Sequence, residues 1–296
     1  MLHVATVHWQ SDAWIPVQLR QLGRFGPTDT RIWACLNGIS DPPAGAFHRV
    51  VDLEGTHPQK LNVLAEMIAT EANDDDHILF LDGDAFPVRP LEPLLADSAT
   101  LFAVRRDENL GDPQPHPCFC ITTVGYWRTV SGDWSPGYKW QNTLGVMVTD
   151  PGANLLHALE ERGDPWRPLV RQNTVDLHPV WFALYGDDEY GPVAYHHGAG
   201  FRGRVARVDT MLAGFSTEMD KPVRNDSRIP GLRRMQRHYL SRRRARRRRR
   251  WESEEGARQA ALADEIFRAI LDDEDMVERF RPRAGAPQTD GTQHPA

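Results

Sequence analysis

Residues 78–87 read Ile-Leu-Phe-Leu-Asp-Gly-Asp-Ala-Phe-Pro, an apolar run that leads directly into two acids. Four consecutive large apolar residues are typical of a buried strand. Asp82 and Asp84 follow that strand, and side chains two residues apart on an extended chain point to the same side. Two neighbouring carboxylates at a buried strand end are unfavourable unless they are compensated. A divalent cation compensates them, because Mg²⁺ and similar ions bind carboxylate and phosphate oxygens.

Strand and helix patterns alternate on the N-terminal side of this stretch. The apolar periodicity predicts strands at 2–9, 31–38 and 48–54 and helices at 12–24 and 59–72. Such alternation is typical of an α/β sheet with helices on both faces. In these sheets ligands bind beyond the carboxyl ends of the strands. The sequence therefore predicts a ligand site around residues 82–84.

The rest of the chain divides by composition. After residue 100 the helical pattern is weak until 151–162, and the intervening sequence is rich in Trp, Pro, Gly and His. We predict a catalytic domain over 1–215 and an Arg-rich and acidic helical extension over 216–280. A Pro-, Gly- and Gln-rich tail at 281–296 is predicted to be disordered.

Length and composition indicate a globular protein. The chain has 296 residues, 40% of them hydrophobic, and three Cys, too few and odd in number for a disulfide framework. Its first residues show no secretion-signal pattern, and no window offers the roughly 20 apolar residues of a membrane span. We expect a cytoplasmic location, with a peripheral membrane contact as one option.

Together with three later segments, the Asp82-Gly83-Asp84 motif resembles the GT-A glycosyltransferases, in particular the glycogenin-like and related bacterial nucleotide-sugar transferases. Residues 142–148 (NTLGVMV) resemble their N-x-G-V-M segment. Residues 172–178 (QNTVDLH) lie where these families place a D-Q-x-x-x-N segment, and 195–202 (YHHGAGFR) resemble their late His-x-x-Gly segment. The resemblance covers about residues 1–205.

The resemblance implies a Rossmann-like mixed sheet flanked by helices, a nucleotide-sugar donor and a metal bound by the D-x-D motif. Three departures leave open whether the enzyme is retaining or inverting. The N-x-G-V-M match carries one extra residue, the D-Q pair is missing, and Arg202 stands where Lys-Pro-Trp is usual.

The predicted metal ligands are Asp82, Asp84 and His197, the last implied by the late histidine segment. His196 is the alternative to His197, because the two are adjacent. An imidazole ligand favours Mn²⁺ over Mg²⁺.

Further residues are predicted to contact the donor or the acceptor. Thr6 and His8 end the first strand, where the nucleotide base is expected, and Gly83 lets the backbone approach a ligand closely. Lys60 and Asn62 begin a helix, whose N-terminus favours anions. Arg202 is a candidate to hold the leaving diphosphate. Candidates for a general base are Asp176 first and Asp188 second. The aromatic residues Trp134, Tyr138 and Trp140 could stack on sugar or pack in the core.

Two further features have several interpretations. The sequence His116-Pro-Cys118-Phe-Cys120 lacks the second ligand pair of a zinc site, and we interpret its cysteines as buried apolar residues. Residues 231–250 contain eleven Arg and no acid. Anionic lipid, an acidic protein or nucleic acid all fit this charge, but the absence of interleaved aromatics disfavours specific nucleic-acid recognition. Pairing with the acidic helix at 255–280 is the preferred interpretation, and membrane contact comes next.

Two alternatives to sugar transfer remain open. The stretch FLDGDAF and the later LYGDDE resemble motifs of haloacid-dehalogenase phosphatases, although that nucleophile motif usually opens its domain. The second alternative is a non-catalytic binding protein that acts through the Arg-rich segment.

Overall fold

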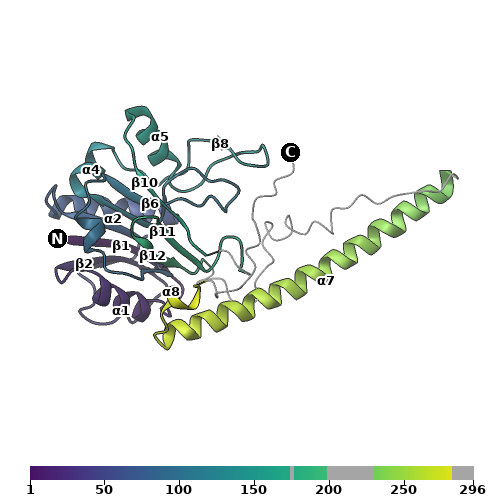
Figure 1. The fold of residues 1–296 in the computed structure, drawn as a ribbon, viewed down its shortest axis with the longest axis horizontal. Helices are drawn as coiled ribbons and strands as arrows, with labels where there is room; N and C mark the ends of the chain where they lie inside the picture. Colours follow the sequence, from purple (N-terminus) through teal and green to yellow (C-terminus); the bar gives the residue numbers. More distant parts are fainter. Residues whose placement is uncertain (174–176, 199–229, 282–296) are drawn as a thin grey trace.

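A ten-stranded mixed sheet organises the part of the chain that the computed structural model describes, namely residues 1–173, 177–198 and 230–281 (Figure 1). Its strand order is β3-β2-β1-β4-β7-β6-β10-β11-β12-β5. The strands are β1 (Leu2–Trp9), β2 (Thr30–Asn37), β3 (Arg49–Val51), β4 (His77–Asp82), β5 (Ala85–Pro87), β6 (Leu101–Val104), β7 (His116–Thr123), β10 (Arg167–Arg171), β11 (Ala183–Asp187) and β12 (Gly191–His196). A separate hairpin pairs β8 (Trp140–Gln141) with β9 (Met147–Val148).

The N-terminal half of the sheet is parallel. Strands β3, β2, β1 and β4 run in one direction, and Val7 of β1 lies opposite both Cys35 of β2 and Asp82 of β4. The carboxyl ends of these strands therefore meet at one edge of the sheet. Strand β7 is antiparallel to β4, so its first residues, from His116, lie at the same edge.

Helices cover both faces, which confirms the predicted fold class of a mixed sheet flanked by helices with a C-terminal helical extension. They are α1 (Ile15–Phe25), α2 (His57–Glu71), α3 (Glu92–Leu95), α4 (Val124–Thr129), α5 (Ala153–Arg162), α7 (Pro230–Leu271) and α8 (Met276–Arg279). On β4, Leu79 and Leu81 join a core cluster with Leu22 of α1, whereas Ile78 and Phe80 join a different cluster with Leu64 of α2. The continuous apolar run of β4 follows from this burial on both faces.

Two differences from the predictions affect residues near Asp82 and Asp84. Helix α2 begins at His57 rather than 59, because the Gln59 side chain accepts a hydrogen bond from the Thr56 N–H at 2.8 Å and Pro58 fits the first turn. The strand predicted to lead into the two acids is β4, and the residues after the acids form a second strand that was not predicted. The chain turns at Gly83 and Asp84, and the short strand β5 then pairs with β12 at the far side of the sheet.

The C-terminal segment packs against the sheet domain. The helix predicted at 255–280 extends back to Pro230 and breaks after Leu271, with α8 following. Ile266, Ile270 and Met276 share a core cluster with residues of α1, β5 and β12. Arg20 of α1 donates to the carbonyl oxygens of Ile270 and Leu271 at 2.5 and 3.3 Å. The predicted domain boundaries at 215 and 280 fall at residues outside or bordering the described ranges and stay predictions.

No helix in the described ranges is long and apolar enough to cross a membrane.

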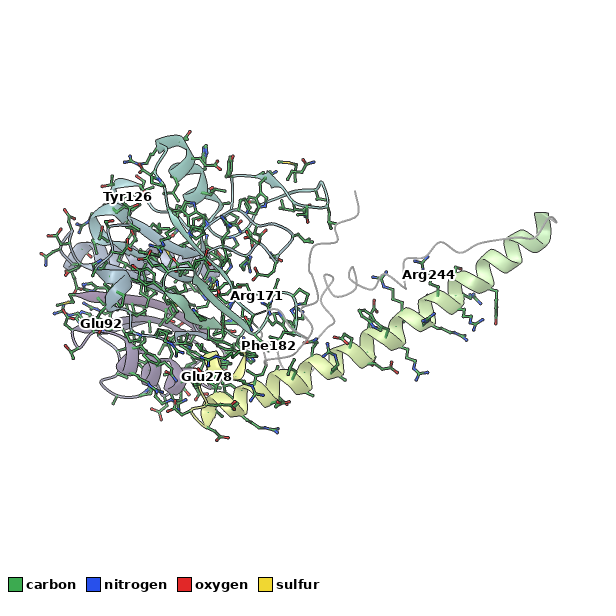
Figure 2. The ribbon with its side chains drawn as sticks, in the orientation of Figure 1. Glu92, Tyr126, Arg171, Phe182, Arg244 and Glu278 are labelled. Carbon is green, nitrogen blue, oxygen red and sulfur yellow. The ribbon has the colours of Figure 1, made fainter. Side chains whose placement is uncertain are left out.

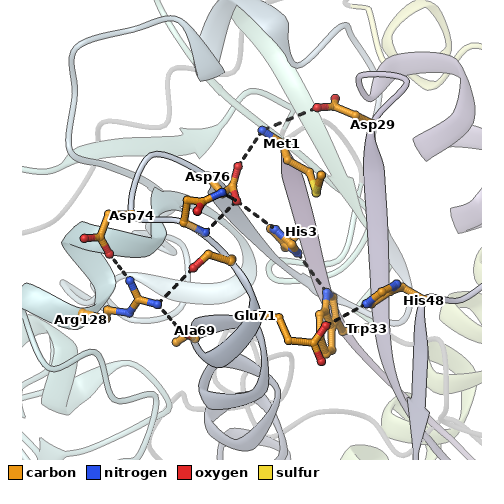
Figure 3. Close-up of polar contacts among 12 residues, drawn as sticks. Met1, His3, Asp29, Trp33, His48, Ala69, Glu71, Asp74, Asp76 and Arg128 are labelled. Carbon is orange, nitrogen blue, oxygen red and sulfur yellow. Dashed lines mark hydrogen bonds and ion pairs between the residues drawn. The ribbon is translucent and has the colours of Figure 1, made fainter.

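The amino-terminal ends of β1 and β4 are joined by a network of polar contacts around Asp76 (Figure 3). Its carboxylate accepts the Asn73 backbone N–H at 2.9 Å, and it lies 3.0 Å from the Met1 amine and 3.6 Å from Nε2 of buried His3. Burial would raise the pKa of Asp76, but the Asn73 N–H and the Met1 amine outweigh burial and lower it.

We expect Asp76→Asn to lower the free energy of unfolding at neutral pH by about 1–3 kcal/mol, the usual contribution of a part-buried charged hydrogen bond. Because folding lowers this pKa, the wild-type contribution is complete above the unfolded-state value near 4 and is lost as the pH falls through the folded-state value. Urea unfolding at neutral and acidic pH measures both. The difference between the two proteins should shrink in acid, and a difference that is constant with pH would contradict the assignment.

Candidate metal and nucleotide site

A cavity of about 540 Å³ opens at the carboxyl edge of β1 and β4. Its walls come from segments far apart in the sequence: the end of β1, the start of α2, the turn after β4, the loop after β6, the start of β7 and the end of β12. The lining residues are Val7, His8, Trp9, Ser11, Trp14, Gly55, His57, Lys60, Asp82, Gly83, Asp84, Arg106, His116, Pro117, Pro151, His196 and Gly198. The predicted position of a ligand site next to residues 82–84 therefore coincides with a cavity.

Three potential metal ligands meet in this cavity. Nε2 of His196 lies 3.5 Å from Oδ2 of Asp82 and 3.4 Å from Oδ1 of Asp84. One ligand atom from each of the three lies within 4.8 Å of the other two. The pairing of β12 with β5 creates this cluster, because it places His196 opposite Ala85, the residue after Asp84.

The histidine that lies beside both acids is His196 and not the predicted His197. Adjacent residues at a strand end point to opposite sides, so His197 points away from the acids. Its ring packs 4.7 Å from Trp14 and 5.0 Å from Phe182, and its Nδ1 lies 3.0 Å from the Tyr195 hydroxyl. Burial lowers the pKa of His197 to about 4, so it is a neutral core residue at physiological pH.

The donor set fits a divalent cation. Oδ1 of Asp82 is buried and accepts no hydrogen bond among the described residues, although Nε2 of His57 lies 3.1 Å away. Burial disfavours a charged His196, but neighbouring Cys118 and Asp84 outweigh burial and raise its pKa well above the usual value. The carboxylates of Asp82 and Asp84 lie 3.5 and 3.4 Å from this imidazole nitrogen, so the site favours positive charge, which a metal ion would supply in place of the proton.

Gln18 of α1 fixes the turn that carries both acids. The Gln18 side chain of α1 donates hydrogen bonds of 2.9 Å to the carbonyl oxygens of Asp82 and Ala85. Its oxygen lies 3.2 Å from Nε2 of His8, and burial lowers the pKa of His8 to about 4. A Cβ on Gly83 would lie 2.7 Å from the Val7 carbonyl oxygen, so only glycine fits between this turn and β1. Gln18 is a positioning residue that the sequence patterns did not reveal.

Two basic side chains line the cavity near the acids. Lys60 is buried and donates to Oδ1 of Asn37 at the end of β2. Arg106 pairs with Asp112 at 3.1 Å and Asp150 at 2.5 Å. Burial alone would lower the pKa of Arg106, but these two carboxylates outweigh burial and raise it. Lys60 was predicted as a ligand contact, whereas Arg106 and His57 of the same cavity stand in no sequence motif and were missed. His116 also lines the cavity, although its motif was considered only as a zinc site.

Three predicted contacts lie away from the cavity. Thr6 is buried within the sheet and does not line the cavity, unlike His8 at the strand end. Asn62 donates to Asp133 at 2.6 Å and accepts the Trp134 N–H at 2.9 Å, so its role is structural. Residues 60 and 62 of a helix are separated by about 200° around its axis, so they face different surroundings.

Asp188 is the third. It lies in the exposed turn between β11 and β12, and the length of β12 separates this turn from His196, about 16 Å at the usual rise per residue. The neighbouring acids Asp187 and Glu189 pair with Arg167, each at 2.6 Å. The other two predicted catalytic residues, Asp176 and Arg202, lie outside the described residues.

The aromatic and cysteine candidates pack against other residues of the fold. Trp134 is fully buried, with ring centroids 5.0 Å from Phe80 and 5.4 Å from Trp127, so it belongs to the core. Tyr138 stacks on His157 at 4.8 Å. Cys118 and Cys120 are buried free thiols, which agrees with their interpretation as apolar residues.

No protein-family model matches the chain, and no curated protein matches its sequence. Among solved structures, it is similar to the galactosyltransferase LgtC in complex with donor and acceptor sugar analogues (14% identity, TM-score 0.34), over 53% of this chain and 70% of that one. It is also similar to the apo-form glycosyltransferase GlyE of Streptococcus pneumoniae TIGR4 (15% identity, TM-score 0.31), over 44% of this chain and 35% of that one. These overlaps are partial, and the functional argument rests on the cavity itself.

Removal of His196 tests the metal assignment. We expect His196→Ala to weaken Mn²⁺ binding at least about a hundredfold, because a direct ligand should contribute no less than the second-shell groups whose loss costs 10–100-fold. His197→Phe should retain Mn²⁺ binding and change mainly the melting temperature, because His197 packs among aromatic rings. Calorimetric titration of both variants with Mn²⁺ measures the difference. Loss of binding in His197→Phe alone would reverse the assignment.

Proposed function

We propose that the chain is a metal-dependent glycosyltransferase, of the hexosyltransferase kind, that moves a sugar from a nucleotide-sugar donor to an acceptor hydroxyl. One observation carries the proposal: Asp82, Asp84 and His196 converge in a cavity at the carboxyl edge of a parallel sheet. This is the edge at which α/β sheets bind nucleotides. The motif resemblance supports the same activity.

In this proposal Asp82, Asp84 and His196 hold the cation, and Mn²⁺ is the preferred ion because one ligand is an imidazole. When bound, the cation would supply positive charge for the donor diphosphate. Gly83 lets this turn pack closely on β1, and it lines the cavity between the two acids.

The remaining cavity residues would bind and orient the donor. Lys60 and Arg106 provide fixed positive charge for phosphate oxygens, and Arg106 is held in place by Asp112 and Asp150. The end of β1, with Val7, His8 and Trp9, would receive the nucleoside. Trp9 is about half exposed there, and its ring could stack on a base.

The chemical step needs groups besides the metal ligands. Among the described residues that line the cavity, the only carboxylates are Asp82 and Asp84, which the cation would occupy. We therefore propose Asp176 as the general base and Arg202 as a contact for the leaving diphosphate, on the strength of the motif resemblance. The position of Asp188 does not favour a catalytic role for it.

The position of Asp188 also argues against a haloacid-dehalogenase phosphatase. That interpretation needs the acids of the LYGDDE segment near Asp82, but Asp187 and Asp188 lie at the far end of β12. A non-catalytic binding protein would not require the convergence of two acids and His196 in a cavity.

We expect nucleoside diphosphates to raise the melting temperature of the protein only when Mn²⁺ or Mg²⁺ is present. At a ligand concentration of a hundred times Kd the gain in stability should reach about 2.7 kcal/mol. Asp84→Asn should abolish this gain, because it removes a metal ligand. A thermal-shift screen of nucleoside diphosphates and nucleotide-sugars, with each metal and with a chelator, measures it.

Asp188→Asn is the matched control, since it removes the same charge from an exposed turn outside the cavity. It should keep the full metal-dependent gain. A gain that persists in Asp84→Asn, or that needs no metal, would contradict the proposal. Hydrolysis of simple phosphate monoesters that is lost in Asp82→Asn would favour the phosphatase instead.

A further inference from the structure

The first half of α7 is a strongly basic surface. Eight of the ten residues at 241–250 are Arg, and Figure 2 shows this part of the helix, with Arg244 labelled, projecting beyond the sheet domain. The acidic residues predicted to pair with it belong to the same continuous helix, so they cannot fold back along the Arg run. Within the helix, Arg248 pairs with Glu252 and Arg250 pairs with Glu254. The stretch 231–250 carries eleven Arg and no acid, so its net charge is strongly positive.

One face of this helix combines arginine with an exposed aromatic residue. Tyr239, Arg243, Arg246 and Arg250 follow at spacings of four, three and four, which places them on a common face. The side chain of Tyr239 is 65% exposed. Tyrosine is enriched at membrane interfaces, and clustered arginines are attracted to anionic headgroups.

A second, independent feature is an exposed apolar tip on the β8–β9 hairpin. Leu144, Val146 and Met147 are 70%, 53% and 58% exposed. Hydrogen bonds fix the conformation of the tip, because Oδ1 of Asn142 accepts the backbone N–H groups of Leu144 and Val146, each at 3.0 Å. With its backbone donors satisfied by Asn142, the loop presents three apolar side chains outward.

Both features lie on the side to which the cavity opens. In Figure 1 the N-terminus lies at the left, so the carboxyl ends of β1 and β4 face right. The β8 hairpin and the Arg-rich part of α7 project in that same direction. The hairpin is also joined to the cavity wall, since the Thr143 N–H donates to the Leu110 carbonyl and Arg106 pairs with Asp150.

We propose that this side of the molecule binds an anionic lipid membrane surface. The apolar tip, formed by Leu144, Val146 and Met147, enters the interface, and the arginines of α7 contact headgroup phosphates. Neither feature alone gives stable attachment, because peripheral binding usually needs an apolar insertion together with basic charge. Nucleic acid would use the arginines but would leave the apolar tip without a role.

Co-sedimentation of the full chain with lipid vesicles tests this, without donor or metal, so its outcome is independent of sugar transfer. We expect binding to vesicles of equal parts phosphatidylcholine and phosphatidylglycerol, at least about tenfold tighter than to phosphatidylcholine alone, and weakening with salt. The triple variant R243Q/R246Q/R250Q should lose roughly a hundredfold in affinity, whereas R243K/R246K/R250K should bind as wild type. L144S/M147S should lose at least about tenfold.

Val63→Ser is the matched control for the hairpin, because Val63 is an exposed apolar residue on α2. It should leave vesicle binding unchanged, and unchanged melting temperatures would show that all the variants fold. Equal binding to both vesicle types, or wild-type binding by either the glutamine or the serine variant, would overturn the proposal. So would tighter binding to a double-stranded oligonucleotide than to the anionic vesicles.

Discussion

The mutual repulsion of Asp82 and Asp84 at a buried strand end is the constraint on which the rest of the structure depends. Such a pair is tolerated only if the fold brings positive charge to it. The chain does this by turning at Gly83 and adding the three-residue strand β5 to the far side of the sheet, next to β12. That pairing delivers His196, and Gln18 fixes the turn through two carbonyl oxygens. The approach of His196 to Asp82 and Asp84 thus depends on the short backbone pairing between β5 and β12.

The local elements could be predicted from the sequence where periodicity is strong. Strand β4 and helix α2 are examples. Burial of β4 on both faces gives a continuous apolar run, and burial of one face of α2 gives apolar residues at helical spacing. The division of residues 77–86 into two strands could not be predicted, since Ala85 and Phe86 continue the apolar pattern although their hydrogen-bond partners change from β7 to β12. A helical Arg-rich extension was predicted over 216–280, but its continuity with the acidic helix was not. A run of arginines has no apolar periodicity, so only its helical backbone reveals it.

The site was predictable where residues are adjacent in sequence and less so where the fold brings them together. Asp82 and Asp84 are two residues apart, and their convergence follows from strand geometry alone. The choice between His196 and His197 depends on which face of β12 turns to the cavity, and both residues carry the same side chain. Arg106 and His57 come from a loop and a helix start, and no motif marks them. Lys60 and Asn62 both begin α2, but only Lys60 lines the cavity. A position at a helix start therefore predicts that a residue lies near the site, but not that its side chain faces it.

Strand β12 also ties the C-terminal segment to the site. Its end alternates between two environments, with His196 facing the acids and His197 facing Trp14, which in turn lies 4.6 Å from Phe267 of α7. Tyr195 stacks near Phe280 at 6.2 Å, after α8. The residues that follow the Arg run therefore form part of the packing behind His196.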